Sequence, residues 1–263
     1  MKHFMKQLAA IMIVSLVIIS CKKEANQIAA DSISKEAMTK IANLGFNTSN
    51  AQLTEGGYLV EGDIFLSEAS LNERPTSPKL RIAEVEQYHT FNLVTGLPRI
   101  ITVSTSGSIS TGLSAAINNA IARYNAQPLS LSFLRVSSGG DINISVVKTS
   151  QYIASAGFPT GGNPFNEIKY ARQYSNYSDG FMTTVLAHEM GHCIGFRHTD
   201  YMNRAYSCGS GGNEGQVTTG VGAINIPGTP TGPDAASWML ACLGASTNRP
   251  FNLNDVTALK YVY

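Results

Sequence analysis

Three histidines and one glutamate fall within residues 188–198, which read H-E-M-G-H-C-I-G-F-R-H. His188 and His192 are four residues apart, so on a helix their imidazoles share one face and can reach the same ion. Gly195 permits the left-handed turn that ends a helix, and the returning chain brings His198 to the same point. The spacing therefore predicts a metal site built on one helix and the turn after it.

The residue types indicate a catalytic metal rather than a structural one. Three neutral nitrogen ligands leave one position of a Zn²⁺ ion open, whereas a structural zinc is normally closed by four protein ligands. Glu189 lies beside the ion, where its carboxylate can take a proton from metal-bound water. The alternative is a core helix that happens to carry histidines. Histidine usage favours the metal, because three of the five histidines in the chain belong to this motif.

The extended pattern H-E-x-x-H-x-x-G-x-x-H resembles the metzincin metallopeptidases, and the string through Thr199 and Asp200 is similar to the bacterial dual-action HEIGH metallopeptidases. This resemblance implies an α+β zincin domain with a mixed twisted sheet, an active-site helix and a C-terminal helix. It also implies a Zn²⁺-dependent endopeptidase that cuts protein or peptide substrates. His188, His192 and His198 would hold the zinc, and Glu189 would be the general base.

Two later segments extend the resemblance. Ser237-Trp238-Met239 is similar to the Met-turn that places a methionine beneath the zinc histidines of metzincins, although a single methionine is more often core filler. Astacins and serralysins have a tyrosine two residues after this methionine, where this chain has Ala241. Oxyanion stabilisation would then fall to zinc and backbone donors. Residues 253–263 look like the terminal helix of matrixins and astacins, with Asn254 as N-cap.

The elements that must position the motif can be traced by hydrophobic periodicity. Apolar residues at helical spacing from Leu113 to Tyr124 predict a helix, and a second helix should run from about Phe181 to Ile194 after a cap at Ser178 or Asp179. Buried or alternating patterns predict strands at 100–103, 129–134, 142–147 and 167–174. In zincin folds an exposed edge strand pairs with extended substrate, and the resemblance suggests residues 168–174 for this role; the alternative is an ordinary solvated edge.

The N-terminus predicts export. Lys2, His3 and Lys6 precede a short apolar run, so residues 1–20 are expected to be a signal peptide. Ser20-Cys21 resembles a bacterial lipobox, in which Cys21 would carry the lipid; the alternative is an ordinary signal peptide with an incidental cysteine. By analogy with lipoproteins we expect an outer-membrane lipoprotein of the bacterial cell envelope, facing the periplasm or the cell surface. It would touch the membrane only through its lipid anchor.

Residues 21–86 are expected to be a tether and propeptide-like segment, followed by a peptidase domain at 87–263. Glu61-Gly62-Asp63-Ile64 is similar to the segment of astacin propeptides whose aspartate blocks the zinc, so Asp63 is a candidate inhibitory zinc ligand. The alternative is a surface turn. Arg74, Lys79 or Arg81 could be an activation cleavage point.

The remaining cysteines and Asp200 could support the region after the motif. An envelope location permits a disulfide, and Cys208 with Cys242 is the favoured pair, although Cys193 could pair with either. Asp200 either accepts a hydrogen bond from a ligating histidine or makes a loop salt bridge.

Composition limits the other functions. A net charge of +1 with 14% charged residues leaves no electrostatic footprint for nucleic acid, and we expect a monomer. The competing function is a surface-tethered binding or adhesion lipoprotein whose zinc site is vestigial or structural.

Overall fold

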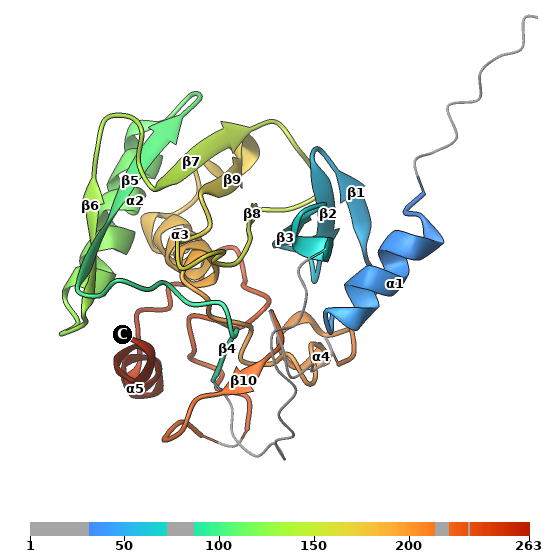
Figure 1. Ribbon diagram of the computed structural model, residues 1–263. Coiled ribbons are helices and arrows are strands. Elements are labelled where there is room, and N and C mark those ends of the chain that lie inside the picture. Colours follow the sequence, from blue (N-terminus) through green and yellow to red (C-terminus); the bar gives the residue numbers. More distant parts are fainter. Residues whose placement is uncertain (1–31, 73–86, 214–220, 231) are drawn as a thin grey trace, which may run out of the picture. The chain divides into compact units, whose positions relative to one another are not determined.

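In the part of the chain that the structure describes, eight strands form one mixed sheet in the order β1-β2-β3-β8-β9-β7-β5-β6 (Figure 1). The strands are β1 (Gln52–Thr54), β2 (Gly57–Val60), β3 (Ile64–Ser67), β5 (Arg99–Ser106), β6 (Leu131–Arg135), β7 (Ile142–Val147), β8 (Ala154–Ala156) and β9 (Glu167–Ala171). The strands β6, β5, β7 and β9 are parallel, β8 is antiparallel to β9, and β1 to β3 form a meander whose last strand pairs in parallel with β8. The predicted α+β class with a mixed sheet is confirmed.

This computed structural model describes residues 32–72, 87–213, 221–230 and 232–263. The histidine motif belongs to the compact unit Ile33–Tyr263. The predicted signal peptide at 1–20, Cys21 and the candidate cleavage points at 74, 79 and 81 lie outside the described residues. Within the described ranges, no helix is both long and apolar enough to cross a membrane.

One face of the sheet is buried, as alternation in the sequence predicts. Ile101 and Val103 of β5 are fully buried, whereas Ile100, directly before Ile101, is 61% exposed. In β6, Phe133 is buried and Leu134 is exposed. Successive side chains of a strand point to opposite faces, so each strand contributes every second residue to the core.

Two helices pack against each other beneath this face. They are α2 (Thr111–Asn125), capped by the side chain of Ser110, and α3 (Asp179–Cys193), capped by Ser178. Every α3 residue from Phe181 to Cys193 is buried, because the sheet covers one side of the helix and the C-terminal segments cover the other (Figure 1). A helix buried all round holds its side chains in fixed positions, which suits the histidines that it carries.

The C-terminal segments close the underside of α3. Short elements here are β4 (Tyr88–His89), which pairs with β10 (Ile224–Asn225), and α4 (Ala205–Cys208); the chain ends in α5 (Leu253–Val262). The predicted N-cap at Asn254 is wrong. Asn252 is the cap: its side chain accepts hydrogen bonds from the backbone N–H groups of Asn254 and Asp255, and the Asp255 carboxylate accepts one from the Asn252 N–H. This reciprocal pair is a capping box, with an amide in the capping position.

The predicted substrate-binding edge strand is also wrong. The strand β9 pairs with β7 on one side and β8 on the other, so neither of its edges is open. Its residues, 167–171, are followed by the short helix η2 (Arg172–Tyr174). The strand beside the histidine helix is β8, and the N–H of its Ala156 donates to the carbonyl of Asp63, 3.0 Å away.

The segment before residue 73 is folded onto the same unit. It contains α1 (Lys35–Asn43), the β1 to β3 meander and the short helix η1 (Ser70–Asn72). Ile41, Phe46 and Val60 form a core cluster that also includes Phe158 and Val221. The predicted domain boundary at residue 87 adjoins residues that are not described and stays a prediction.

A buried ion pair joins this segment to the histidine motif. Arg197 is fully buried, and its Nη2 lies 3.0 and 3.1 Å from the two carboxylate oxygens of Glu61. Its Nη1 donates to the carbonyl of Val221 at 2.7 Å, and its guanidinium lies over the ring of Phe46 at 4.5 Å. An arginine in this position needs its carboxylate, because an unpaired buried charge is strongly destabilising.

We predict that Glu61→Ala lowers the free energy of unfolding by about 3–5 kcal/mol, since Arg197 keeps its charge and loses its partner. Denaturant unfolding of the full chain measures this. Glu55→Ala is the matched control, because Glu55 is exposed on the turn between β1 and β2 and surface substitutions change stability by about 0.5 kcal/mol or less. Equal effects of the two substitutions would contradict a structural role for the pair.

Candidate metal centre

The end of α3 brings the three histidines together. His188 and His192 lie one turn apart on α3, whose C-cap is Ile194. Gly195 follows with φ +109°, and a Cβ there would lie 2.8 Å from the carbonyl oxygen of Asn92. Only glycine fits this conformation without strain. The turn returns the chain, so that the ring centroid of His198 lies 5.3 Å from that of His188 and 4.9 Å from that of His192.

Backbone carbonyls orient two of the rings. Nδ1 of His188 lies 2.9 Å from the carbonyl oxygen of Trp238, and Nδ1 of His192 lies 2.8 Å from that of Phe196. A carbonyl only accepts, so each Nδ1 donates and each Nε2 keeps its lone pair for a ligand. Both Nε2 atoms are buried and have no hydrogen-bond partner. Burial and the neighbouring rings of His188 and His198 hold the pKa of His192 well below its usual value, so its imidazole is neutral.

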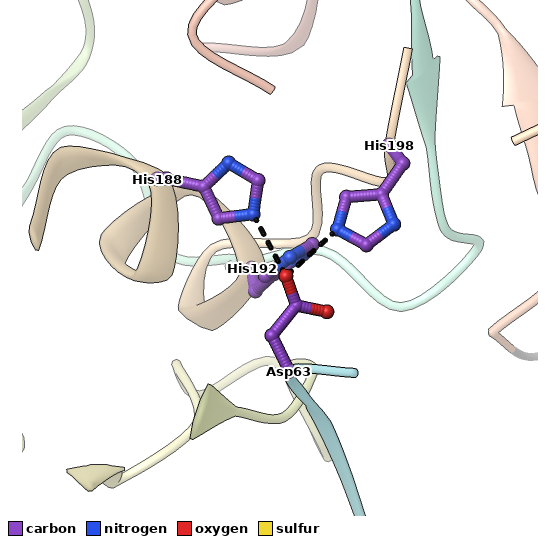
Figure 2. A group of neighbouring side chains, drawn as sticks. All are labelled: Asp63, His188, His192 and His198. Carbon is purple, nitrogen blue, oxygen red and sulfur yellow. Dashed lines mark hydrogen bonds and ion pairs between the residues drawn. The ribbon is translucent and has the colours of Figure 1, made fainter. Parts of the chain in front are cut away.

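Asp63 completes the group from the turn between β2 and β3. Figure 2 shows its carboxylate directed at the three imidazoles, with Oδ2 3.2 Å from Nε2 of His198 and 3.4 Å from Nε2 of His188. Ligand atoms of Asp63 and the three histidines all lie within 4.8 Å of one another. Burial would raise the pKa of Asp63, but the adjacent His198 and His188 lower it more, so the pKa lies well below its usual value.

This donor set fits zinc. Two unpartnered imidazole nitrogens, a third histidine and a carboxylate are ligand types that zinc takes in tetrahedral sites, at about 2.0–2.2 Å. The three histidines alone would leave the fourth position to water or substrate. With Asp63 in place, the same centre has four protein donors.

Glu189 lies at the boundary between this group and a cavity. Its side chain is buried, Oε2 has no hydrogen-bond partner, and it lines the cavity together with His188. Burial raises the pKa of this carboxyl well above its usual value, and the charge of Asp63 raises it further. A buried carboxylate without a partner needs a chemical explanation.

Met239 lies beneath the helix that carries the ligands. It is fully buried, and a Cβ on Gly191 would meet its sulfur at 2.6 Å, so the glycine of the motif makes room for the methionine. The Met239 carbonyl accepts from the N–H of Thr199 at 2.9 Å, next to His198. The turn thus supports the third histidine through Met239, while the Trp238 carbonyl orients the first.

A disulfide and an aspartate fasten the chain after the motif to this turn. Cys208 and Cys242 are bonded, with Cα atoms 5.1 Å apart, and Cys193 is a buried free thiol. The Asp200 carboxylate accepts from the N–H of Ala241 at 3.0 Å and from the hydroxyl of Ser207. Asp200 therefore links the loop to the residue after Leu240, a role that neither prediction for it described.

The sequence interpretation missed Glu61 and Arg197. Arg197 anchors the segment that presents Asp63, because its guanidinium pairs with the carboxylate of Glu61. The available signal was that Arg197 lies in the sequence between His192 and His198, which are both buried. An arginine in a buried segment is rarely without a carboxylate partner.

The chain belongs to the family described as dual-action HEIGH metallo-peptidases, whose sequence profile matches residues 58–263. It is therefore a zinc metallopeptidase that acts on proteins or peptides, as predicted. The search of curated proteins gave no match.

Solved structures that match this chain do so at low identity. One structure of myroilysin is 17% identical, with a TM-score of 0.43 over 65% of this chain and 82% of that one. A second is 15% identical, with a TM-score of 0.44 over 66% and 86%. High choriolytic enzyme 1, a hatching enzyme zinc-protease of the medaka fish Oryzias latipes, is 16% identical, with a TM-score of 0.42 over 65% and 92%.

We predict one equivalent of zinc per chain in the protein after dialysis, and its loss in His192→Ala. Removing even an outer partner of a ligand weakens metal binding by about 10–100-fold, so removing a ligand should cost more. Elemental analysis by mass spectrometry measures the stoichiometry. His89→Gln is the control, because His89 is a buried histidine outside the group. Zinc retained in His192→Ala would exclude this residue as a ligand.

Proposed function

We propose that this member of the family is an endopeptidase in which His188, His192 and His198 hold the zinc and Glu189 is the general base. The observation that carries the proposal is the buried Glu189 carboxylate, unpartnered at Oε2 and lining the cavity beside His188. Zinc bound by the three imidazoles supplies Lewis acidity that polarises a carbonyl and acidifies water.

Glu189 then accepts the proton of the attacking water and transfers it to the leaving amine. Its position one residue after His188 places it beside the centre without making it a ligand. The backbone carbonyls of Trp238 and Phe196 fix the orientation of the His188 and His192 imidazoles, so that Nδ1 donates and Nε2 faces inward.

We further propose that Asp63 holds the enzyme latent. Its Oδ2 lies within 3.4 Å of the Nε2 atoms of two of the histidines, in the position where substrate or water would complete the zinc coordination. Its backbone carbonyl also accepts a hydrogen bond from the N–H of Ala156 on β8. Both contacts must be broken before a peptide can reach the centre.

A lipid anchor at Cys21 would hold the enzyme at the bacterial outer membrane as a monomer. The support for this is the sequence of the N-terminus alone. Labelling cells with a radioactive fatty acid should mark the full-length protein and leave Cys21→Ala unlabelled. A labelled Cys21→Ala protein would exclude this anchor.

We predict that Glu189→Gln keeps its zinc and loses about 100-fold or more of kcat, since general base catalysis contributes about 10²–10⁴-fold. Cleavage of an unbiased peptide library, with zinc measured in parallel, tests this. The experiment also separates the enzyme from a tethered binding protein with a vestigial site, for which neither form would cleave. Activity equal to that of the unmodified chain would refute the assignment of the base.

We predict that Asp63→Ala raises the activity of the full chain at least tenfold before any proteolysis, because the fourth zinc position becomes available. Mass spectrometry of the intact protein confirms that it is uncut. Asp179→Ala is the control, since Asp179 is an exposed acid at the start of α3. Unchanged latency would disprove the inhibitory role of Asp63.

A further inference from the structure

A cavity of about 340 Å³ opens beside His188 and Glu189. Its walls are largely apolar and include Ile153, Val185 and Leu240. A pocket of this size next to the reacting centre accommodates one substrate side chain.

We propose that Arg249 makes this cavity select an acidic side chain of the substrate, Glu or Asp. The inference rests on the proposed peptidase function and assigns its specificity. Two arginines, Arg204 and Arg249, line the cavity, and their surroundings differ.

The guanidinium of Arg204 already contacts other groups of the protein. Its Nη1 donates to the carbonyl of Glu61, and its Nη2 lies against the sulfur atoms of Cys208 and Cys242. The guanidinium therefore serves the turn that presents Asp63.

Arg249 is fixed in place and keeps unused donors. Its backbone N–H donates to the hydroxyl of Thr184 at 2.9 Å, its carbonyl accepts from Nη1 of Arg123 at 2.8 Å, and its own Nη1 donates to the carbonyl of Cys242 at 3.1 Å. A fixed guanidinium loses less entropy when it binds a ligand.

No carboxylate among the described residues lies within ion-pair distance of Arg249. The acids whose charge acts most strongly on Arg249 are Asp200 and Asp255. Their carboxylates already accept hydrogen bonds from other groups. The acids of the cavity itself, Asp63 and Glu189, belong to the metal centre. A half-buried arginine with further N–H groups to donate and no carboxylate partner among the described residues matches a carboxylate that arrives with the substrate.

The test uses the zinc-loaded full chain with Asp63→Ala and a matched pair of small ligands, N-acetyl-Glu-amide and N-acetyl-Gln-amide. Ligand-observed NMR gives both affinities. We expect the acidic ligand to bind at least about tenfold more tightly, as for hydrogen bonds to a charged group. Arg249→Gln should bring the ratio close to one, and Arg249→Lys should retain a several-fold preference because it keeps the charge.

Charge reversal separates recognition from a structural role. Arg249→Glu should prefer N-acetyl-Lys-amide to the acidic ligand, which a merely destabilised pocket would not do. Arg99→Gln, which removes an arginine outside the cavity, should leave the ratio unchanged. Equal binding of the Glu and Gln ligands, a preference that survives Arg249→Gln, or no binding of either ligand would overturn the proposal.

Cleavage of a hexapeptide library by the same Asp63→Ala protein gives an independent reading. One position beside the cut should be enriched in Glu and Asp, and Arg249→Gln should remove the enrichment. Absence of all cleavage would count against the proposed peptidase mechanism, whereas the binding ratio would still decide the role of Arg249.

Discussion

The structure depends on holding three buried imidazoles directed at one point. Burying such polar rings together is costly unless their nitrogen atoms find a partner, such as a metal ion or a carboxyl group. The carbonyls of Trp238 and Phe196 fix two of the rings, and glycines 191 and 195 permit the close approach of Met239 and of the Asn92 backbone. The complete burial of α3, the turn at Met239 and the disulfide that holds the following loop all serve this arrangement.

A second constraint arises one residue before His198. The charge of Arg197 is buried, so the motif cannot fold without a carboxylate from elsewhere in the chain, and Glu61 supplies it. Glu61 has φ +54°, which is unusual for a residue other than glycine, and Gly62 follows at φ +90°. The ion pair stabilises this tight turn, and the turn delivers Asp63 to the histidines. The metal centre and the N-terminal segment therefore depend on each other to fold.

Local signals in the sequence predicted much of this. The histidine spacing, the cap at Ser178 and the strands β6 and β7 follow from residue type and period, whereas the Met-turn was expected from the family resemblance. The wrong predictions depend on how distant or adjacent segments are arranged, which a local sequence pattern does not reveal. Alternation in 167–174 identifies a strand but cannot say that β7 and β8 flank it, and two asparagines two residues apart, at 252 and 254, offer equivalent caps until the backbone is known. The Arg197 pair spans 136 residues, a separation at which no periodic pattern carries information.

Two carboxylates two residues apart thus have different tasks, and their surroundings show why. The Glu61 side chain is 1% exposed and pairs with the guanidinium of Arg197, which has no other carboxylate partner among the described residues. It also lies 3.8 Å from Nδ1 of His198, so its main contact is structural. The Asp63 side chain is 15% exposed at the edge of a cavity, and its ion pairs are with Nε2 of His188 and His198. The proposed latency and the Arg197 ion pair therefore depend on separate side chains, and the Asp63→Ala substitution should leave the Arg197 pair in place.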